Sequence, residues 1–293
     1  MSATAEEIAS QPATWSAALS RSAQATAVLP AAGPSVAVIG CGTSFFVAEA
    51  VARAREASGG GLTDAIVASE FVPGLRPYDR VLAISRSGTT TEVVRALGSL
   101  PADLPSTAIS AVADSPVVRA ADDALVLEFA DERSVVQTRF ATTTILLLRA
   151  HLGENVDAAL ADASVAVAAP LPVVASAFDH FVFLGTGWTV GLADEAALKL
   201  REASLSWSES YPAMEYRHGP VSLAGPRTLV WMLGVDDEHL AGDVRATGAT
   251  VVGGGMDPLA ELILVQRLAV GLAEAKGLDP DHPRHLTRSV VLS

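Results

Sequence analysis

The stretch that decides the fold is VAVIGCGTS at residues 36–44. Its four leading apolar residues predict a strand buried on both faces, and the Gly-Cys-Gly turn with two hydroxyl residues is typical of the step from such a strand into a helix. The same arrangement returns as FVFLGTGWT at residues 181–189. Because strand, Gly-x-Gly turn, hydroxyl residue and helix occur twice, we expect two α/β units of similar length.

Outward from these two turns, short apolar stretches alternate with helical segments. In the first half we expect strands at 36–39, 65–68, 80–84, 107–112 and 125–129, and helices at 44–58, 90–97 and 135–151. In the second half we expect strands at 181–184, 228–233 and 250–252, and helices at 190–206 and 258–276. This alternation predicts an α/β fold of mostly parallel, doubly wound sheets with helices on both faces.

The chain is expected to divide into three parts. Residues 1–30 form an N-terminal helical segment with one helix over about 6–29, residues 31–160 form the first α/β domain, and residues 170–293 form the second with a C-terminal tail. The connection around 161–172 is short and rich in Ala, Val and Pro, so we expect the two halves to pack together.

Composition narrows the class of protein. The 293 residues are 50% hydrophobic and carry a net charge of −13, which opposes nucleic-acid binding as the main activity. Prolines interrupt the longest uncharged stretches, so no membrane-spanning helix is expected. One cysteine, Cys41, excludes an internal disulfide framework and a multi-cysteine metal site. The N-terminus lacks the pattern of a signal peptide, and we expect a cytoplasmic protein.

The segment AISRSGTTTE at residues 83–92 follows a predicted strand and opens a predicted helix. Five hydroxyl residues and a glycine fall within the seven positions 85–91. A helix N-terminus offers unpaired N–H groups, to which hydroxyls add uncharged donors, so the segment suits a phosphate monoester. An ordinary helix cap is the alternative, although it needs only one hydroxyl. Neither Gly-x-Gly turn has the third glycine of a dinucleotide fingerprint.

A second segment, DEAALKLRE at residues 194–202, places Glu195, Lys199 and Glu202 on one helix face. This face is either solvated, with an ion pair contributing about 0.3–0.5 kcal/mol, or a carboxylate held by a lysine for proton transfer. A third, EYRHGP at 215–220, puts His218 on a turn. The other histidines show no paired metal-ligand spacing, so no metal is expected.

Together these segments resemble the SIS (sugar isomerase) family with two such domains, most closely the isomerase half of glucosamine-6-phosphate synthase and stand-alone phosphosugar deaminases and deglycases. The resemblance runs in the family's order through residues 8–12, 40–44, 68–71, 85–90, 195–202, 215–220 and 283–289. It implies two tandem SIS domains.

The resemblance also implies roles. Ser44, Ser85, Ser87 and Thr90 would bind the sugar phosphate. Glu202 would move a proton between C1 and C2 of the open-chain sugar, supported by Lys199, and His218 would assist ring opening from the partner subunit of a homodimer. The loop ERSVVQT at 132–138 matches a family loop that closes the site, with Val135 and Gln137 near the sugar. The other residues expected to bind substrate or phosphate are Gly42, Thr43, Arg86, Thr89, Ser134, Glu195 and Arg288.

Two departures from the synthase stand out. Its C-terminal lysine forms a Schiff base with fructose 6-phosphate, but this chain has Arg288 at that position. A guanidinium stays protonated and cannot serve as that amine, although it can hold a carboxylate or phosphate oxygen. The chain begins Met-Ser-Ala, where the synthase has a catalytic cysteine, so no glutamine-hydrolysing domain is expected.

We therefore expect a phosphosugar isomerase/deaminase that acts on an amino- or amine-substituted sugar 6-phosphate by ring opening, C1–C2 proton transfer and amine release. No cofactor or metal is expected, and neither nucleic acid nor membrane is an expected partner. The alternatives are a fructosamine-6-phosphate deglycase, a plain aldose–ketose isomerase and a non-catalytic phosphosugar sensor. The presence of both Glu202 and His218 favours catalysis.

Overall fold

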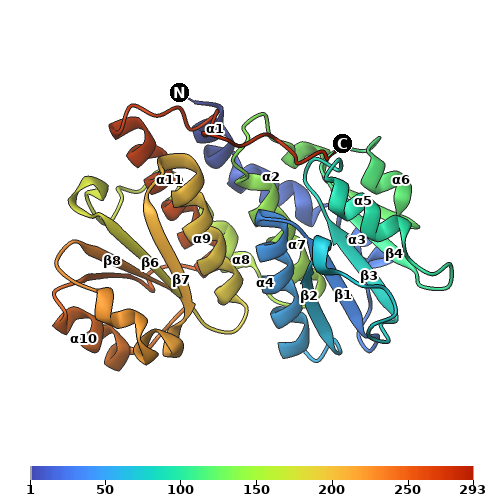
Figure 1. Ribbon diagram of the computed structural model, residues 1–293, viewed down its shortest axis with the longest axis horizontal. Helices are drawn as coiled ribbons and strands as arrows, with labels where there is room; N and C mark the ends of the chain where they lie inside the picture. Colours follow the sequence, from blue (N-terminus) through green and yellow to red (C-terminus); the bar gives the residue numbers. More distant parts are fainter. Residues whose placement is uncertain (1, 293) are drawn as a thin grey trace.

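Two parallel sheets form the centre of the structure, a computed structural model that describes residues 2–292. The first sheet contains β1 (Val36–Gly40), β2 (Thr63–Val67), β3 (Arg80–Ile84), β4 (Ser106–Ser110) and β5 (Asp123–Val126), in the order β2-β1-β3-β4-β5. The second contains β6 (His180–Gly185), β7 (Trp207–Pro212), β8 (Thr228–Leu233) and β9 (Thr250–Gly253), in the order β7-β6-β8-β9. The expected α/β fold with parallel sheets flanked by helices is confirmed (Figure 1).

Helices follow most strands. They are α4 (Thr43–Ala57), α5 (Thr91–Gly98), α6 (Pro116–Ala120), α7 (Arg139–His151), α8 (Asp157–Ala166), α9 (Thr189–Ser204), α10 (Glu238–Ala246) and α11 (Pro258–Ala275). Short 3₁₀ helices occupy η1 (Ala68–Glu70), η2 (Glu128–Ala130), η3 (Ala175–Ala177), η4 (Ala213–His218) and η5 (Pro220–Leu223). Among residues 2–292, none of the helices combines the length and the apolar character needed to cross a membrane.

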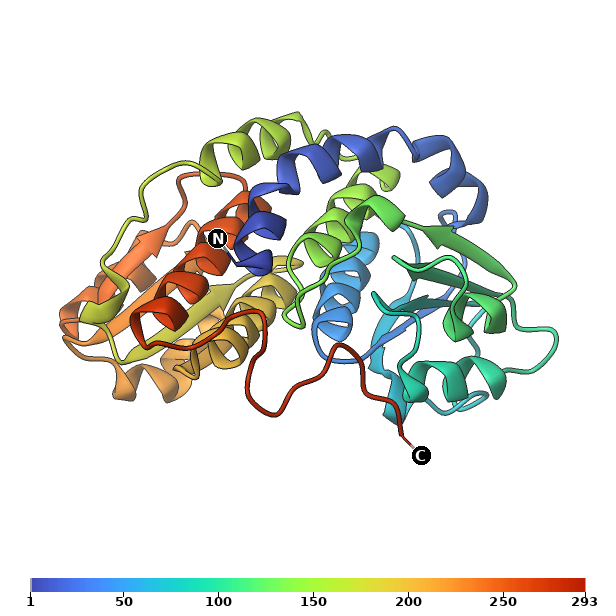
Figure 2. The same cartoon turned by 90° about the horizontal axis from the view of Figure 1, so that it is seen from above.

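The N-terminal segment is not the single helix expected over 6–29. It forms α1 (Ala3–Ala9), α2 (Gln11–Leu19) and α3 (Ser22–Val28). Pro12 explains the first break, because it has no N–H to donate to the carbonyl oxygen four residues before it, whereas the first turn of a new helix accepts it. α1 packs on α11, and α2 and α3 pack on α7, so the segment spans both halves (Figure 2).

The two halves share one hydrophobic core. α4 and α9 lie between the sheets (Figure 1), and their buried residues form a single cluster with those of α7 and α11. Gly191 of α9 permits the close approach, because a Cβ there would lie 2.5 Å from the carbonyl oxygen of Phe46 and 2.7 Å from the amide nitrogen of Ala50. Separate clusters cover the outer faces of the two sheets.

One helix begins later than expected. The segment 135–138 is not helical, and α7 starts at Arg139. The buried carboxylate of Glu132 accepts hydrogen bonds from the backbone N–H groups of Thr138 (2.5 Å) and Arg139 (2.8 Å). These bonds cap α7 from outside the helix and leave 132–138 as a loop held against its amino end.

Candidate active site

Lys199 occupies the centre of a buried charged cluster between the two halves. Its ammonium nitrogen lies 2.6 Å from Glu202 Oε2 and 3.2 Å from Glu195 Oε1. It also donates a hydrogen bond of 3.1 Å to the hydroxyl of Thr43, at the start of α4. Lys199 and Glu195 are each 1% exposed, so the interpretation of this face as a solvated one is wrong. The cluster joins α9 of the second half to the Gly-Cys-Gly turn of the first.

The charged groups in this cluster shift one another's pKa. Burial raises the pKa of the Glu195 carboxyl to about 7, and the Lys199 ammonium acts in the opposite direction. Burial alone would lower the pKa of Lys199, but the carboxylates of Glu195 and Glu202 outweigh it, and the pKa is raised. Lys199 is therefore a fixed cation. The Glu202 side chain is 20% exposed and can reach a molecule outside the cluster.

The hydroxyl-rich loop lies at the same edge of the first sheet as Thr43. β1 and β3 are parallel neighbours, with Ile39 opposite Ala83, so the residues after both strands emerge side by side. Gly88 takes a φ of 65°, and a Cβ there would lie 2.1 Å from the Ser115 hydroxyl, so a glycine is needed to turn the loop. Thr90 occupies the N-cap position of α5, yet its side chain makes no capping hydrogen bond.

The hydroxyls of the loop are thus not used in capping α5. Ser85 Oγ is buried and has no hydrogen-bond partner in the described structure. Ser87 Oγ accepts hydrogen bonds from the backbone N–H (3.3 Å) and the hydroxyl (3.2 Å) of Thr89. Buried polar groups without partners are costly and are rarely kept without a reason. The loop fits an anion-binding role better than an ordinary helix cap.

The C-terminal tail runs across this loop (Figure 2). The backbone N–H of Thr91 donates to the carbonyl oxygen of Val290 (3.2 Å), and Leu292 N–H donates to the Thr91 hydroxyl (2.9 Å). The hydroxyls of Thr89 and Ser289 are 2.7 Å apart. The tail therefore covers the amino end of α5, where the first-turn N–H groups of a helix are otherwise free for an anion.

Two residues expected to bind phosphate or substrate direct their side chains to other protein groups. The guanidinium of Arg86 donates to the carbonyl oxygens of Ser134, Val135 and Arg288, away from the loop. The hydroxyl of Ser134 donates to the carboxylate of Glu7 and to the carbonyl of Val136. Arg86 and Ser134 are 2% and 1% exposed, and the bonds of both side chains hold the loop 132–138 in place.

The remaining expected residues are distributed as follows. Gly42 takes a φ of 55° at the start of α4, and Ser44 is buried in its first turn. Gln137 Oε1 is buried without a partner, and the backbone N–H of Val135 donates to the carbonyl of Asp281. Arg288 pairs with Asp131 at 2.5 Å, and its expected contact with the substrate stays a prediction.

His218 stands apart from this group. It is exposed at the end of η4, and within residues 2–292 no hydrogen bond or ion pair joins its side chain to another residue. A role in this site would require a second copy of the chain, and that expectation stays a prediction. Exposed apolar side chains lie on the same part of the chain, at Trp207, Met214 and Leu223.

Several residues that hold the candidate site together were not predicted from the sequence. Glu7, Glu132 and Asp281 hold the loop 132–138 and the tail, but no motif in the sequence marks them for this role. Glu49 of α4 faces Asp194 of α9, and burial together with that carboxylate raises the pKa of Glu49 to about 7.

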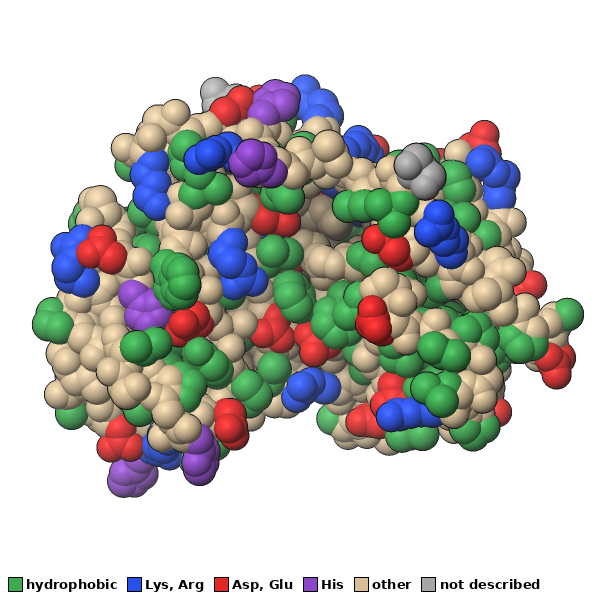
Figure 3. Space-filling model, viewed as in Figure 1, with side chains coloured by type: hydrophobic (Ala, Val, Ile, Leu, Met, Phe, Trp, Pro, Cys, Tyr) green, Lys and Arg blue, Asp and Glu red, His purple; other side chains and the backbone are tan. Residues whose placement is uncertain are grey.

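Acidic side chains gather in the furrow between the two halves (Figure 3). In residues 2–292 no group of three or more His, Cys, Asp or Glu is arranged to hold a metal ion.

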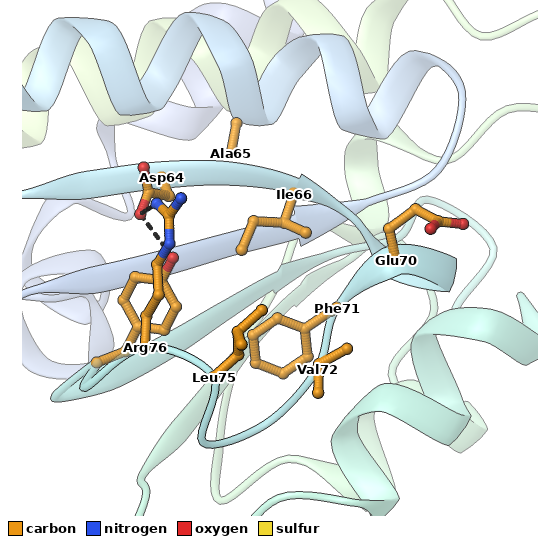
Figure 4. Close-up of a pocket in the computed structure, with 9 residues that line it drawn as sticks. Asp64, Ala65, Ile66, Glu70, Phe71, Val72, Leu75 and Arg76 are labelled. Atoms are coloured by element: carbon orange, nitrogen blue, oxygen red, sulfur yellow. Dashed lines mark hydrogen bonds and ion pairs between the residues drawn. The ribbon is translucent and has the colours of Figure 1, made fainter.

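A cavity of about 310 Å³ lies outside this site, beside the edge strand β2 (Figure 4). The Asp64 carboxylate on its wall accepts hydrogen bonds from the Tyr78 hydroxyl (2.6 Å) and from Arg76 (2.7 Å). These polar groups satisfy one another, and the rest of the lining is largely apolar: Ala65, Ile66, Phe71, Val72 and Leu75. None of the residues expected to bind or convert substrate lines it.

Comparison with known proteins matches residues 31–152 to the SIS domain. The glutamine–fructose-6-phosphate aminotransferase (isomerizing) of Pseudomonas aeruginosa is 29% identical over 88% of this chain and 52% of its own length. Its counterpart in Pseudomonas syringae pv. tomato is 30% identical with the same coverage. The chain therefore spans about half the length of the curated relatives it matches.

Solved structures share the whole architecture. Glucosamine-6-phosphate deaminase from Thermotoga maritima superposes with a TM-score of 0.87 at 27% identity, covering 99% of this chain and 100% of that one. The C-terminal domain of the glucosamine-fructose-6-phosphate aminotransferase from Francisella tularensis gives a TM-score of 0.76 at 21% identity, covering 96% and 98%. The second comparison shows the fold alone.

The two sheets and the shared core define an α/β protein with the architecture of the solved T. maritima deaminase. Residues 31–152 match the SIS domain, and the chain is similar to the isomerizing aminotransferase of P. aeruginosa and, in fold, to the C-terminal domain of the F. tularensis enzyme. The second sheet lies outside the matched residues, so two tandem SIS domains stay a prediction for residues 170–293.

Proposed function

We propose that the chain is an enzyme that acts on an amino- or amine-substituted sugar 6-phosphate. The observation that carries this proposal is the buried Lys199, which joins Glu202 to Thr43 beside the hydroxyl-rich loop. A phosphate on that loop would place a sugar chain close to a carboxylate supported by a fixed cation. This is the arrangement that proton transfer next to a carbonyl requires.

The proposed reaction follows from these groups. Ser85, Ser87 and Thr90 would hold the phosphate with uncharged hydroxyl donors. Glu202 would take a proton from one of the carbons C1 and C2 of the open-chain sugar and return it to the other. That shift converts an amine-bearing carbon into an imine, which water hydrolyses to a carbonyl group and a free amine. Lys199 would keep Glu202 oriented toward the sugar.

The relatives support the general class of reaction. The curated relatives are named for isomerizing transfer to fructose 6-phosphate, and the T. maritima protein is named a glucosamine-6-phosphate deaminase. The relatives support only this general class, and the choice of sugar and of leaving amine is part of our proposal. We further propose that His218 of a second copy completes the site in a homodimer, because His218 is exposed and unpaired in the described chain.

The test is a panel of glucosamine 6-phosphate, amino-acid conjugates of fructosamine 6-phosphate, and the plain aldose and ketose 6-phosphates. Released ammonia, released amino acid and converted sugar are measured separately. We expect amine release from at least one amine-bearing sugar 6-phosphate and little from its unphosphorylated form. Conversion of plain sugar phosphates alone would make the protein an isomerase, and binding without conversion would make it a sensor; either result contradicts the proposal.

A further inference from the structure

Arg86 has an unusual position for the cation of an anion-binding loop. It lies between Ser85 and Ser87, yet its side chain is 2% exposed and points into the protein. Its two terminal nitrogens donate to the carbonyl oxygens of Ser134 (3.0 Å), Val135 (3.2 Å) and Arg288 (3.0 Å). These carbonyls belong to two segments that are remote in sequence, the loop 132–138 and the C-terminal tail.

The burial of this charge is compensated by specific partners. Glu132 Oε2 lies 3.6 Å from Arg86 Nη1, and both side chains are almost completely buried. A planar guanidinium can donate in several fixed directions at once, so it can bridge carbonyls from two segments. An isolated buried cation would be strongly unfavourable, and a buried pair is retained for the geometry it fixes more than for stability.

Of the two segments that Arg86 holds, the tail contacts the hydroxyl-rich loop, and the loop 132–138 is the one that the family resemblance assigns to the sugar. The loop carries Val135 and Gln137, and the buried Oε1 of Gln137 has no partner within the described structure. The tail carries Ser289, whose hydroxyl is 2.7 Å from that of Thr89. Glu7 of α1 holds the same loop from the other side, through the backbone N–H of Arg133 at 2.6 Å.

We propose that Arg86 is a positioning residue, which fixes the loop 132–138 and the tail 284–292 over the hydroxyl-rich loop without itself contacting the phosphate. This inference rests on the proposed function, because it assigns the two segments to the sugar and the loop 85–90 to the phosphate. Affinity for a sugar phosphate then depends on Arg86, whereas affinity for inorganic phosphate does not.

The experiment compares Arg86→Gln with Arg55→Gln. Arg55 is a matched control because it is also buried and donates to the carbonyl oxygens of Ala31, Pro34 and Gly61, at the opposite end of α4 from Thr43. Hydrogen exchange of the ligand-free proteins is followed by mass spectrometry. Binding of inorganic phosphate and of glucosamine 6-phosphate is measured by calorimetry.

In Arg86→Gln we expect residues 132–138 and 284–292 to exchange about tenfold faster or more, with β4 unchanged. We expect affinity for glucosamine 6-phosphate to fall about tenfold and affinity for inorganic phosphate to change less than about threefold. Arg55→Gln is expected to change neither the exchange of the two segments nor the ratio of the two affinities. If Arg86→Gln does not fold, Arg86→Lys keeps the charge opposite Glu132 and is expected to show the same changes to a smaller extent.

Two results would overturn the assignment. If both segments exchange hydrogen in the Arg86→Gln variant at the wild-type rate, Arg86 does not hold them. Equal loss of affinity for inorganic phosphate and for the sugar phosphate would show that Arg86 contacts the phosphate directly. If the wild-type protein binds none of the sugar phosphates, the proposed function fails instead, and the exchange of the ligand-free proteins still decides the role of Arg86.

Discussion

At the scale of single residues, the candidate site depends on which polar groups have partners and which do not. The Ser85 hydroxyl has none, and the Thr90 hydroxyl does not cap the helix it precedes. Lys199, in contrast, is held by three groups at once. The sequence indicated the face shared by Glu195, Lys199 and Glu202 through its helical spacing. It could not indicate that Arg86 and Ser134 turn away, because side-chain direction depends on contacts from segments remote in sequence.

Removal of one loop hydroxyl should weaken phosphate binding before it affects the chemistry. Ser87→Ala and Thr90→Ala each delete a donor to a charged oxygen, a loss of about 1.5–3 kcal/mol. Affinity for a sugar 6-phosphate should then fall roughly tenfold or more, with little change for the unphosphorylated sugar. Calorimetry measures both. Ser16→Ala is the control, because that exposed hydroxyl bonds only within α2. Equal losses for both sugars would show that the loop is structural.

Glu49 should give the protein a pH-dependent stability. Its pKa is raised to about 7 in the folded state by burial and by Asp194, from an ordinary value near 4.5. The folded state therefore favours the protonated form, so the contribution of Glu49 to stability is present below pH 4.5 and is lost as the pH rises through about 7. Glu49→Gln should reduce the fall in melting temperature between pH 5 and pH 7.5. Glu70→Gln, an exposed control, should leave this fall in melting temperature unchanged. An unchanged fall in Glu49→Gln would contradict the role of Glu49.

At the scale of elements, the sequence predicted the apolar strands and missed several short or polar elements. β1, β3, β6 and β8 are central apolar strands, and all were expected. β7 was missed because an edge strand with one exposed side reads WSESYP and has no apolar run. α8 was missed because its alanine-rich sequence resembles a linker, and α10 because it is short and polar. The three N-terminal helices were merged because their apolar residues keep one helical period across Pro12.

The contact between α4 and α9 depends on Gly191. An added Cβ would meet backbone atoms of Phe46 and Ala50, which can give way only if the helices separate. Overpacking of this kind costs about 1–3 kcal/mol, so Gly191→Ala should lower stability to denaturant by that amount and reduce turnover through the displaced Thr43–Lys199 contact. Gly242→Ala in α10 is the control, because a Cβ there meets nothing within 4 Å. It should leave stability unchanged or slightly raised. Unchanged stability in Gly191→Ala would contradict the account.

At the scale of the whole molecule, the site exists only because two α/β units share a core. The turn after β1 and the hydroxyl-rich loop belong to the first unit, whereas Lys199 and Glu202 belong to the second. The tail returns from α11 across the first unit and reaches α5. The sequence predicted the duplication and the motifs. The bond from Lys199 to Thr43 required the packing of α4 on α9, which no local pattern encodes.

The absence of a lysine at position 288 should exclude covalent attachment of the sugar. Arg288 pairs with Asp131 and cannot become a neutral amine. Lys199 has a raised pKa, because two carboxylates keep it protonated. Incubation with fructose 6-phosphate or glucosamine 6-phosphate, borohydride reduction and intact-mass measurement should therefore show no sugar adduct. A stable adduct would restore a Schiff-base mechanism. An Arg288→Lys variant treated in the same way tests whether a lysine amine at position 288 forms a Schiff base that borohydride traps.

The central claim is that Glu202, fixed by Lys199, is the base that acts on the sugar. Glu202→Gln keeps the size of the side chain and removes its charge, and turnover of the amine-bearing sugar 6-phosphate identified by the panel is the direct measurement. We predict a fall on the order of 10²–10⁴-fold, with affinity for the sugar phosphate nearly unchanged. Near-wild-type turnover by Glu202→Gln on that substrate would contradict the assignment.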